Sequence, residues 1–446
     1  MSILELARAR LASPDALVGV VGLGYVGLPL AAAFHASGCR VLGFDTDHAK
    51  IEALTEGRNY LPHLGDTMTR SMASSGRFAA TGDASRLGEA DAVLICVPTP
   101  LGPHQEPDLS FVLNSARDIG RALRAGQLIV LESTTYPGTT RDELLPAMLA
   151  SRPPGSPPLV CGRDFFVAFS PEREDPGRAT HTTRTTPKLV GGLDPASAEL
   201  ATLLYRRAVE RVVTVSSAEV AEAAKILENV FRAVNIALVN EMKQILTPMG
   251  IDVWEVIEAA ATKPFGFMPF HPGPGWGGHC IPIDPYYLTW KAREVGTPTR
   301  FIELAGEINT AMPHYVVERV VGALNDDGKP LKGSRVLVIG VAYKRDVGDM
   351  RETPAAEVIA LLTERGAQVS YHDPHVPVFP RMRRHNIELR SVDLADATVS
   401  GADCVVVVTD HSVIDWSRIA GLARLVVDTR NAMKGLGGRG ARIVKA

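Results

Sequence analysis

The sequence lacks any apolar run approaching the roughly 18–20 residues that a membrane-spanning helix needs. It also lacks an excess of charge, because 47 Lys and Arg residues face 50 Asp and Glu residues, and it has no long basic run. These two absences argue against nucleic acid or a membrane surface as the main partner. The first arginines follow a short apolar patch, whereas in a secretory signal they precede it, so we expect a cytoplasmic protein.

Cysteine is scarce as well, with five residues that are widely spaced. An odd number at such spacing is typical of reduced thiols rather than of a disulfide framework. Cys39, Cys96, Cys161 and Cys404 lie in or beside apolar runs, where a thiol packs as a small hydrophobic side chain. Cys280 differs, because its segment GPGWGGHCIPIDPYYL has four glycines and offers no core. We expect Cys280 to be exposed and reactive, in the most flexible loop of the chain.

Two regions alternate short β-branched runs with helical patterns, as the strands of buried parallel sheets do. The first region has strand candidates in LVGVVGLG, CRVLGFD, DAVLICVP, QLIVLEST and FFVAFSPE. The second has them in RVLVIGV, AQVSYHDP, DCVVVVTD and RLVVDTRN. The expected fold class is therefore α/β, with two Rossmann-like, doubly wound parallel-sheet domains joined by a long central helix and a helical dimerisation region.

The central helix is expected from about residue 216 to 250, with Ser217 as its N-cap and apolar residues at helical spacing. A helix of about 45–50 Å can bridge two domains and form the seam of a dimer. The predicted domains are residues 1–212, a cofactor-binding Rossmann domain; 213–328, a helical region that carries the cysteine loop; and 329–446, a second substrate-binding sheet.

A glycine-rich turn follows the first predicted strand and opens a helix. Its six residues form a GxGxxG motif: Gly22, Leu23, Gly24, Tyr25, Val26 and Gly27. The glycines allow the pyrophosphate of a dinucleotide to approach the helix N-terminus. Asp45 follows Gly27 by 18 residues, the approximate spacing of a carboxylate that binds ribose hydroxyls and repels a 2′-phosphate. The motif favours NAD over NADP, with FAD or an ordinary strand-turn-helix as the alternatives.

The first turn of the second sheet has one glycine where a dinucleotide site wants three. It carries Lys344, Arg345 and Arg351 instead, and Arg430 ends a later strand. Cations at the carboxyl ends of strands suit a phosphate-bearing ligand, so we expect the diphosphate of a second substrate here. A solvated basic surface is the alternative.

A reactive thiol combined with NAD points to oxidation of an aldehyde through a thiohemiacetal and a thioester. Such a reaction, starting from an alcohol, removes four electrons and uses two NAD. It needs a base, an oxyanion partner and a carboxylate that activates water. Lys225 and Asn229 share one face of the long helix, Asp284 lies in the cysteine loop, and Glu172 follows a strand.

No metal is expected at the cysteine loop. His279, Cys280 and Asp284 lack a companion at CxxC or HxxxH spacing, and His271 is too isolated to complete a ligand set. His279 is next to Cys280 in the chain, and adjacent side chains generally point apart. For His279 a structural or substrate-shaping role is therefore expected at least as much as the role of a base.

Seven motifs, in order, resemble those of the UDP-glucose/GDP-mannose dehydrogenase family over essentially the whole chain. They are GLGYVGLPLA, CVPTPL, ESTTYPGTT, SPEREDPGRA, KILENVFRAVNIALVNE, GPGWGGHCIPIDPYYL and GVAYKRDVGDMRETPA. The resemblance implies an NAD domain, a central helical region that forms a homodimer, and a C-terminal domain that binds a UDP-sugar.

The resemblance also implies roles for individual residues. Cys280 matches the nucleophile, Lys225 and Asn229 the pair that assists alcohol oxidation, Asp284 the acid beside them, and Glu172 with Thr134 the thioester-hydrolysis residues. The implied cofactor contacts are Gly22 to Gly27, Asp45, Lys50, Thr99, Thr134 and Arg351. The implied substrate contacts are Glu172, Lys225, Asn229, His271, Gly277, Lys344, Arg430 and Arg300. Arg300 or Lys263 would substitute for a family arginine that is missing here.

One departure concerns the sugar. UDP-glucose enzymes carry Lys directly before the loop Asp, whereas this chain has Ile283. The segments GGHCIPIDPYYL and TRFIELAGEIN resemble the branch that oxidises UDP-N-acetylhexosamines. The expected reaction is oxidation of UDP-N-acetylglucosamine to its uronate, as in polysaccharide biosynthesis. UDP-N-acetylmannosamine, UDP-glucose and GDP-mannose remain open, as do a two-electron hydroxyacid dehydrogenase and a non-catalytic nucleotide-sugar or NAD sensor.

Overall fold

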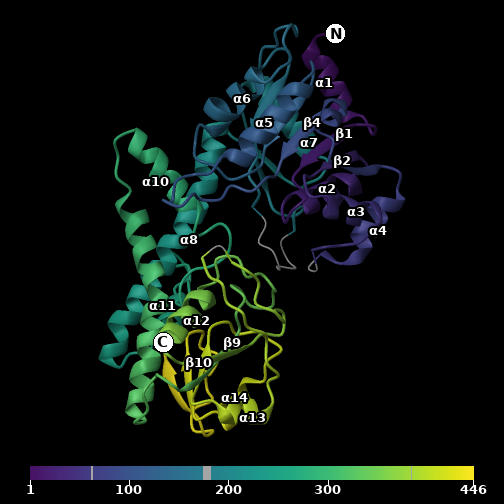
Figure 1. The fold of residues 1–446 in the computed structure, drawn as a ribbon. Coiled ribbons are helices and arrows are strands. Elements are labelled where there is room, and N and C mark those ends of the chain that lie inside the picture. The colour runs from purple at the N-terminus through teal and green to yellow at the C-terminus, as the bar shows by residue number, and fades with distance from the viewer. Residues whose placement is uncertain (62–63, 174–181, 383) are drawn as a thin grey trace. The chain divides into compact units, whose positions relative to one another are not determined.

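The computed structural model describes residues 1–61, 64–173, 182–382 and 384–446. The chain divides into two compact units, which are shown in Figure 1 and described separately below. The first unit comprises residues Met1–Glu228 and Tyr286–Thr297, and the second comprises Asn229–Pro285 and Pro298–Ala446. Part of the expected motif SPEREDPGRA lies outside the described residues.

The first unit is built on an eight-stranded sheet with the order β3-β2-β1-β4-β5-β6-β7-β8. Its first six positions follow the strand order of a dinucleotide-binding fold. The strands are β1 (Leu17–Val21), β2 (Arg40–Phe44), β3 (Phe78–Thr81), β4 (Ala92–Ile95), β5 (Leu128–Leu131), β6 (Phe166–Phe169), β7 (Lys188–Gly192) and β8 (Val212–Thr214). All neighbours pair in parallel except β6 and β7, which are antiparallel. The sequence had predicted the parallel strands but not this reversal.

Apolar side chains alternate between the two faces of this sheet, which explains why helices cover both. In β4, Ala92 and Leu94 belong to one buried cluster, and Val93 and Ile95 belong to another. The first cluster packs against α2 and α7, and the second against α5 and α6. The helices are α1 (Ile3–Ala12), α2 (Gly27–Ala36), α3 (His48–Thr55), α4 (Asp66–Ser74), α5 (Ser110–Ala122), α6 (Leu145–Ala150) and α7 (Pro195–Tyr205), and a π-helical turn spans Thr139–Leu144.

The second unit contains a five-stranded, wholly parallel sheet with the order β10-β9-β11-β12-β13. Its strands are β9 (Arg335–Ile339), β10 (Gln368–His372), β11 (Cys404–Val407), β12 (Leu425–Asp428) and β13 (Arg442–Lys445). Buried clusters again lie on both faces, one with α11 and α12 and the other with α13 and α14. The remaining helices of the chain are α8 (Ala218–Leu246), α9 (Val253–Ala261), α10 (Asp284–Glu294), α11 (Arg300–Asp326), α12 (Pro354–Glu364), α13 (Asp396–Gly401) and α14 (Trp416–Leu422). The part of α8 up to Glu228 and the part of α10 from Tyr286 belong to the first unit. The expected α/β class with two sheets and a long helix is confirmed.

The long helix α8 begins as the sequence predicted, with the Ser217 hydroxyl accepting a hydrogen bond from the backbone N–H of Val220 at 3.3 Å. One turn further, the buried carboxylate of Glu222 accepts hydrogen bonds from Gly138 N at 2.6 Å, Thr140 N at 2.9 Å and the Thr140 hydroxyl at 2.7 Å. Burial raises the pKa of Glu222 to about 7, although these donors oppose the rise. Glu222 thus fastens the start of α8 to the turn at Gly138.

Among the described residues, no helix combines the length and the apolar composition that crossing a bilayer requires. All five cysteines lie in the described part of the chain, and none of them forms a disulfide there. Cys39, Cys96 and Cys404 are buried and Cys280 is exposed, as expected.

Glu222→Gln tests the anchor of α8. In either amide orientation one backbone or hydroxyl donor faces an NH2 group, so we expect a loss of about 1–3 kcal/mol in the free energy of unfolding at pH 5, where the raised pKa keeps Glu222 neutral and both of its oxygens still accept. Urea denaturation followed by circular dichroism measures it. The control is Glu219→Gln, which removes a partly exposed pair with Arg141 and should cost about 0.5 kcal/mol. Equal midpoints for Glu222→Gln and the wild type would contradict the anchor.

Candidate active site

The turn after β1 contains one glycine that leaves space for a ligand and a second glycine that no other residue could replace. A Cβ atom on Gly27 would lie 1.8 Å from the carbonyl oxygen of Gly22, so this position must be glycine for the turn to form. A Cβ atom on Gly24 would meet nothing within 4 Å. The open side at Gly24 is where the pyrophosphate of a dinucleotide approaches the backbone. The residues of this turn therefore fit NAD.

Asp45 follows β2 and is buried against the same turn. Its carboxylate accepts hydrogen bonds from Leu23 N at 2.8 Å, Lys50 Nζ at 3.0 Å and Asp47 N at 3.0 Å. These bonds fix the carboxylate beside the turn, and a carboxylate has lone-pair capacity for ribose hydroxyls as well. Of the other expected cofactor contacts in this unit, Thr99 is buried, Thr134 is partly buried and Tyr25 is exposed.

Two expected catalytic residues meet in the second unit. Asn229 Nδ2 donates to Asp284 Oδ2 at 2.5 Å, and both side chains are buried. Asp284 begins α10, and its backbone N–H donates to the carbonyl oxygen of Cys280 at 2.8 Å. Lys225, one turn before Asn229 in α8, is only 8% exposed, so it is not the solvated lysine that helices usually carry. The exposed Cys280 is thus one turn away from a buried carboxylate-amide pair.

The glycines before Cys280 serve close packing, which corrects the expectation of a flexible loop. A Cβ atom on Gly277 would lie 2.8 Å from the Cβ of Tyr343, and one on Gly278 would lie 2.9 Å from its ring. The N–H of Gly278 donates to the carbonyl oxygen of Arg351 at 3.0 Å. The loop therefore lies against the segment after β9 where no side chain would fit.

The two histidines near Cys280 differ in environment. Burial, together with the nearby Arg351, lowers the pKa of His279 to about 4, so the imidazole is neutral at neutral pH. His271 is exposed, and its ring stacks on Trp254 with centroids 5.3 Å apart. His279 is therefore suited to shaping the loop rather than to carrying charge.

A buried lysine and a part-buried arginine meet at Gly273. Arg430 donates from Nε to Val408 O at 2.8 Å, and a Cβ atom on Gly273 would lie 2.6 Å from its Nη1. Lys243 Nζ donates to the carbonyl oxygen of Gly273 at 3.1 Å. Burial, and then Arg430 and Arg319, lower the pKa of Lys243 to about 7, while burial also lowers the pKa of Arg430. An anion bound here would stabilise both cations. Lys243 was not among the residues expected from the sequence.

Three further residues of this unit were expected to contact the cofactor or the substrate. Arg351 forms a bidentate pair with Asp349, in which Nε donates to Oδ1 at 3.0 Å and Nη2 donates to Oδ2 at 2.6 Å. Lys344 is partly buried in the turn after β9, and Arg300 is exposed at the start of α11.

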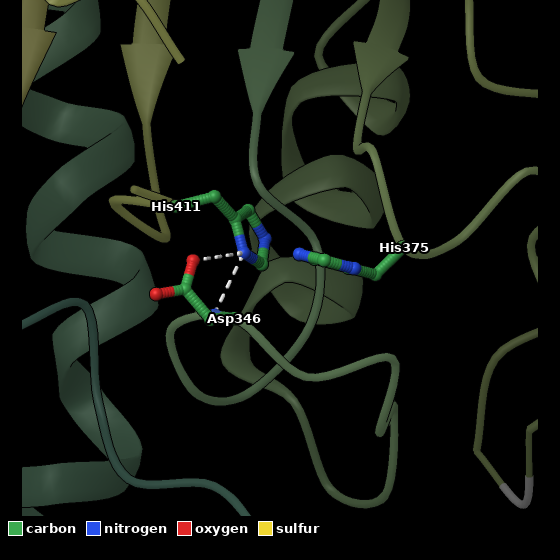
Figure 2. Close-up of side chains that lie close together, drawn as sticks. All are labelled: Asp346, His375 and His411. Atoms are coloured by element: carbon green, nitrogen blue, oxygen red, sulfur yellow. Dashed lines mark hydrogen bonds and ion pairs between the residues drawn. The ribbon is translucent and has the colours of Figure 1, made fainter. Parts of the chain in front are cut away.

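Asp346, His375 and His411 offer ligand atoms that lie within 4.8 Å of one another, the spacing a metal ion needs (Figure 2). His411 is buried, and both of its nitrogens are engaged. Nδ1 accepts from the backbone N–H of Asp346 at 3.0 Å, which makes Nε2 the protonated nitrogen that donates to Asp373 at 3.0 Å. The ring thus ties the turn that carries Lys344 to the sheet, and a metal would have to replace the bond to Asp346.

Glu172 lies in a buried ionic cluster that the sequence analysis missed. Lys188 Nζ donates to Glu172 Oε2 at 3.1 Å and to Glu132 Oε2 at 2.6 Å. Tyr205 donates its hydroxyl proton to the other oxygen of Glu132. A lysine at the start of the apolar run KLVGG was the one signal in the sequence that could have indicated the cluster.

Three family models match nearly the whole chain, all from the UDP-glucose/GDP-mannose dehydrogenase family. They describe its NAD binding domain at residues 16–209, its central domain at 219–311 and its UDP binding domain at 337–435. The chain belongs to this family.

Individual relatives differ in the sugar that their names give. The UDP-N-acetyl-D-glucosamine 6-dehydrogenase of Pseudomonas aeruginosa is 37% identical over 84% of this chain and 86% of the relative. The NDP-N-acetyl-D-galactosaminuronic acid dehydrogenase of Ralstonia nicotianae is 36% identical over 93% and 95%. A solved UDP-D-ManNAc dehydrogenase from Pyrococcus horikoshii superposes with a TM-score of 0.85 at 32% identity, over 96% of this chain and 98% of that one.

The protein is an NAD-dependent nucleotide-sugar 6-dehydrogenase. NAD is confirmed as the cofactor over FAD, and a UDP binding domain is confirmed for the second sheet. Family membership decides against a two-electron hydroxyacid dehydrogenase and against a non-catalytic sensor.

Gly24→Ala and Gly27→Ala separate cofactor approach from turn formation. Gly24→Ala should leave thermal stability within about 0.5 kcal/mol of wild type and raise the KM for NAD about tenfold or more, because the methyl group enters the space of the pyrophosphate. Gly27→Ala should lower the melting temperature even without NAD, because of its clash with Gly22. Thermal melts and NAD titrations give both quantities. Unchanged NAD affinity in Gly24→Ala would place the pyrophosphate elsewhere.

Proposed function

We propose that the protein oxidises the C6 alcohol of UDP-N-acetylglucosamine to the uronate, through a thiohemiacetal and a thioester on Cys280. The observation that carries this proposal is the exposed Cys280 thiol, one turn from the buried Asn229–Asp284 pair. We further propose that residues 1–212 bind NAD, that 213–328 carry the thiol and the subunit contact, and that 329–446 hold the UDP moiety.

Lys225, Asn229 and Asp284 serve the two oxidations. When bound, NAD accepts a hydride from C6 in each of them. The C6 hydroxyl loses its proton to a base, and the resulting aldehyde carbon forms a bond with the Cys280 sulfur. Lys225 and Asn229, adjacent on one face of α8, stabilise the oxyanion of that tetrahedral species. Asp284 holds Asn229 in place through the 2.5 Å hydrogen bond.

Glu172 and Thr134 serve the hydrolysis. Glu172 takes a proton from the attacking water, and Thr134 orients that water, so that the thioester gives the acid and returns the thiol. Glu172 is 14% exposed on its side chain, which leaves it accessible to a water molecule.

Lys344 and Arg430 bind the substrate diphosphate, with His271, Gly277 and Arg300 as further substrate contacts. The adjacent Arg430 and Lys243 side chains support this placement, because burial lowers the pKa of both and a bound anion would stabilise their charged forms. Arg351 contacts the cofactor in this proposal, oriented by Asp349.

Ile283 supports an N-acetylated sugar, because an apolar side chain before Asp284 provides a less charged wall than the lysine of UDP-glucose enzymes. The relative from Pseudomonas aeruginosa, whose name gives UDP-N-acetyl-D-glucosamine, supports the gluco epimer. UDP-N-acetylmannosamine is the second candidate, supported by the name of the solved relative from Pyrococcus horikoshii.

We propose a homodimer that forms through α8. Large apolar side chains remain exposed along this helix, among them Leu227 at 67%, Phe231 at 46% and Leu238 at 52%. A row of such residues on one helix is typical of a surface that another chain covers.

The stoichiometry of NADH tests the reaction. With excess NAD and limiting UDP-N-acetylglucosamine, two NADH should form per sugar, because the route removes four electrons. Cys280→Ser should form at most one NADH and release no uronate. Absorbance at completion and mass spectrometry of the sugar give the counts, with Cys161→Ser, a partly buried thiol, as the control.

One NADH per sugar, with Cys280 dispensable, would contradict the thioester route. Turnover of UDP-glucose but not of UDP-N-acetylglucosamine would keep the route and reject the sugar.

A further inference from the structure

A lysine without access to water joins two carboxylates in the first unit. The Lys188 side chain is 3% exposed and that of Glu132 is 0% exposed, so bulk solvent contributes little to stabilising the charges of this pair. Lys188 divides its donors between Glu132 at 2.6 Å and Glu172 at 3.1 Å. The second oxygen of Glu172 accepts from Arg173 N at 2.7 Å. Both oxygens of Glu172 are therefore oriented, and one of them by a buried cation.

The reversal of β7 places Lys188 at this point. Glu132 follows β5 and Glu172 follows β6, so both lie at the carboxyl edge of the parallel strands. Because β7 runs antiparallel to β6, its first residue lies at that same edge. The register pairs Phe169 with Gly191, and its continuation sets Glu172 opposite Lys188. A parallel β7 would have carried the lysine to the other end of the sheet.

The charged and titratable groups around Lys188 come from several elements. Besides the two carboxylates, Tyr205 of α7 lies with its ring centroid 5.5 Å from Lys188 Nζ, and Cys96 after β4 is buried nearby. Burial raises the pKa of Glu132 to about 7. Burial alone would lower the pKa of Lys188, but the two carboxylates raise it well above its ordinary value. Arg173 pairs outward with Glu228, at 2.5 Å.

We propose that Lys188 is a positioning residue that keeps Glu172 ionised and oriented for thioester hydrolysis. Glu132 is the second carboxylate bound to the same lysine. This inference rests on the proposed role of Glu172. In the hydrolytic step the oxygen of water bonds to the acyl carbon, its proton passes to Glu172, and the C–S bond breaks to release the Cys280 thiolate. As Glu172 becomes neutral, Lys188 keeps Glu132, so no buried cation is left without a partner.

The test separates acylation from deacylation in rapid-mixing experiments with the whole enzyme. Lys188→Met should give a burst of two NADH per active site at a rate within about threefold of wild type. Steady-state turnover should fall about 10- to 100-fold, and intact mass should show an acyl adduct on Cys280. The pH at which hydrolysis falls to half its maximum should rise by about one unit or more, because a carboxylate that loses a neighbouring cation is easier to protonate.

Lys188→Arg should retain most of the hydrolysis. Lys329→Met, which breaks the lysine pair with Asp403 in the other unit, is the control and should show no adduct.

A double variant, Lys188→Met with Glu132→Gln, tests whether Lys188 positions Glu172 or only neutralises the charge of Glu132. It also avoids leaving the Glu132 carboxylate buried without its cation. If Lys188 acts on Glu172, the double variant accumulates the adduct as Lys188→Met does. Recovery of wild-type hydrolysis in the double variant would overturn the proposal, as would the absence of an adduct in Lys188→Met. Glu172→Gln tests the underlying function independently, because its failure to accumulate an adduct would reject the role of Glu172 itself.

Discussion

In both sheets a carboxylate after the second strand holds the turn that follows the first strand. Asp45 accepts Leu23 N at 2.8 Å, and Asp373 accepts Val341 N at 2.7 Å and Ala342 N at 3.1 Å. Backbone N–H groups at the end of a buried strand must find acceptors, and a charged acceptor makes the stronger bond. The positions of the cofactor turn and of the Lys344 turn both follow from this bond.

The two carboxylates differ in the other groups that they bind. Lys50 pairs with Asp45 from a partly exposed position, and the Asp45 carboxylate keeps 8% of its side chain exposed. Asp373 is fully buried and also accepts from His411, so its capacity is used within the protein. The same turn architecture thus occurs in the NAD binding domain and in the UDP binding domain.

Local patterns were sufficient to predict the strands, the GxGxxG turn and the long helix, because each depends on residues close together in the chain. The strand expected in CRVLGFD is β2, and the helix expected from about 216 to 250 is α8 at Ala218–Leu246. Lys188 and Glu132 could not be predicted, because their meeting depends on the antiparallel pairing of β7, which alternation of apolar residues does not encode. The glycines before Cys280 suggested flexibility, but Gly277 and Gly278 are needed because they contact Tyr343 closely. Tyr343 lies more than sixty residues further along the chain, so the local sequence could not reveal this contact.

The burial pattern of the five thiols has a consequence for oxidative damage. Burial raises the pKa of Cys404 to about 12 and of Cys161 to about 11, and it also raises that of Cys96, so these thiols hold their protons and resist oxidants. Cys280 is the exposed cysteine of the chain. A peroxide or an alkylating agent therefore reaches the residue proposed as nucleophile first, and sulfenic acid at that position can be reversed by a small thiol. The enzyme would lose activity before it loses its fold, and a reductant could restore it.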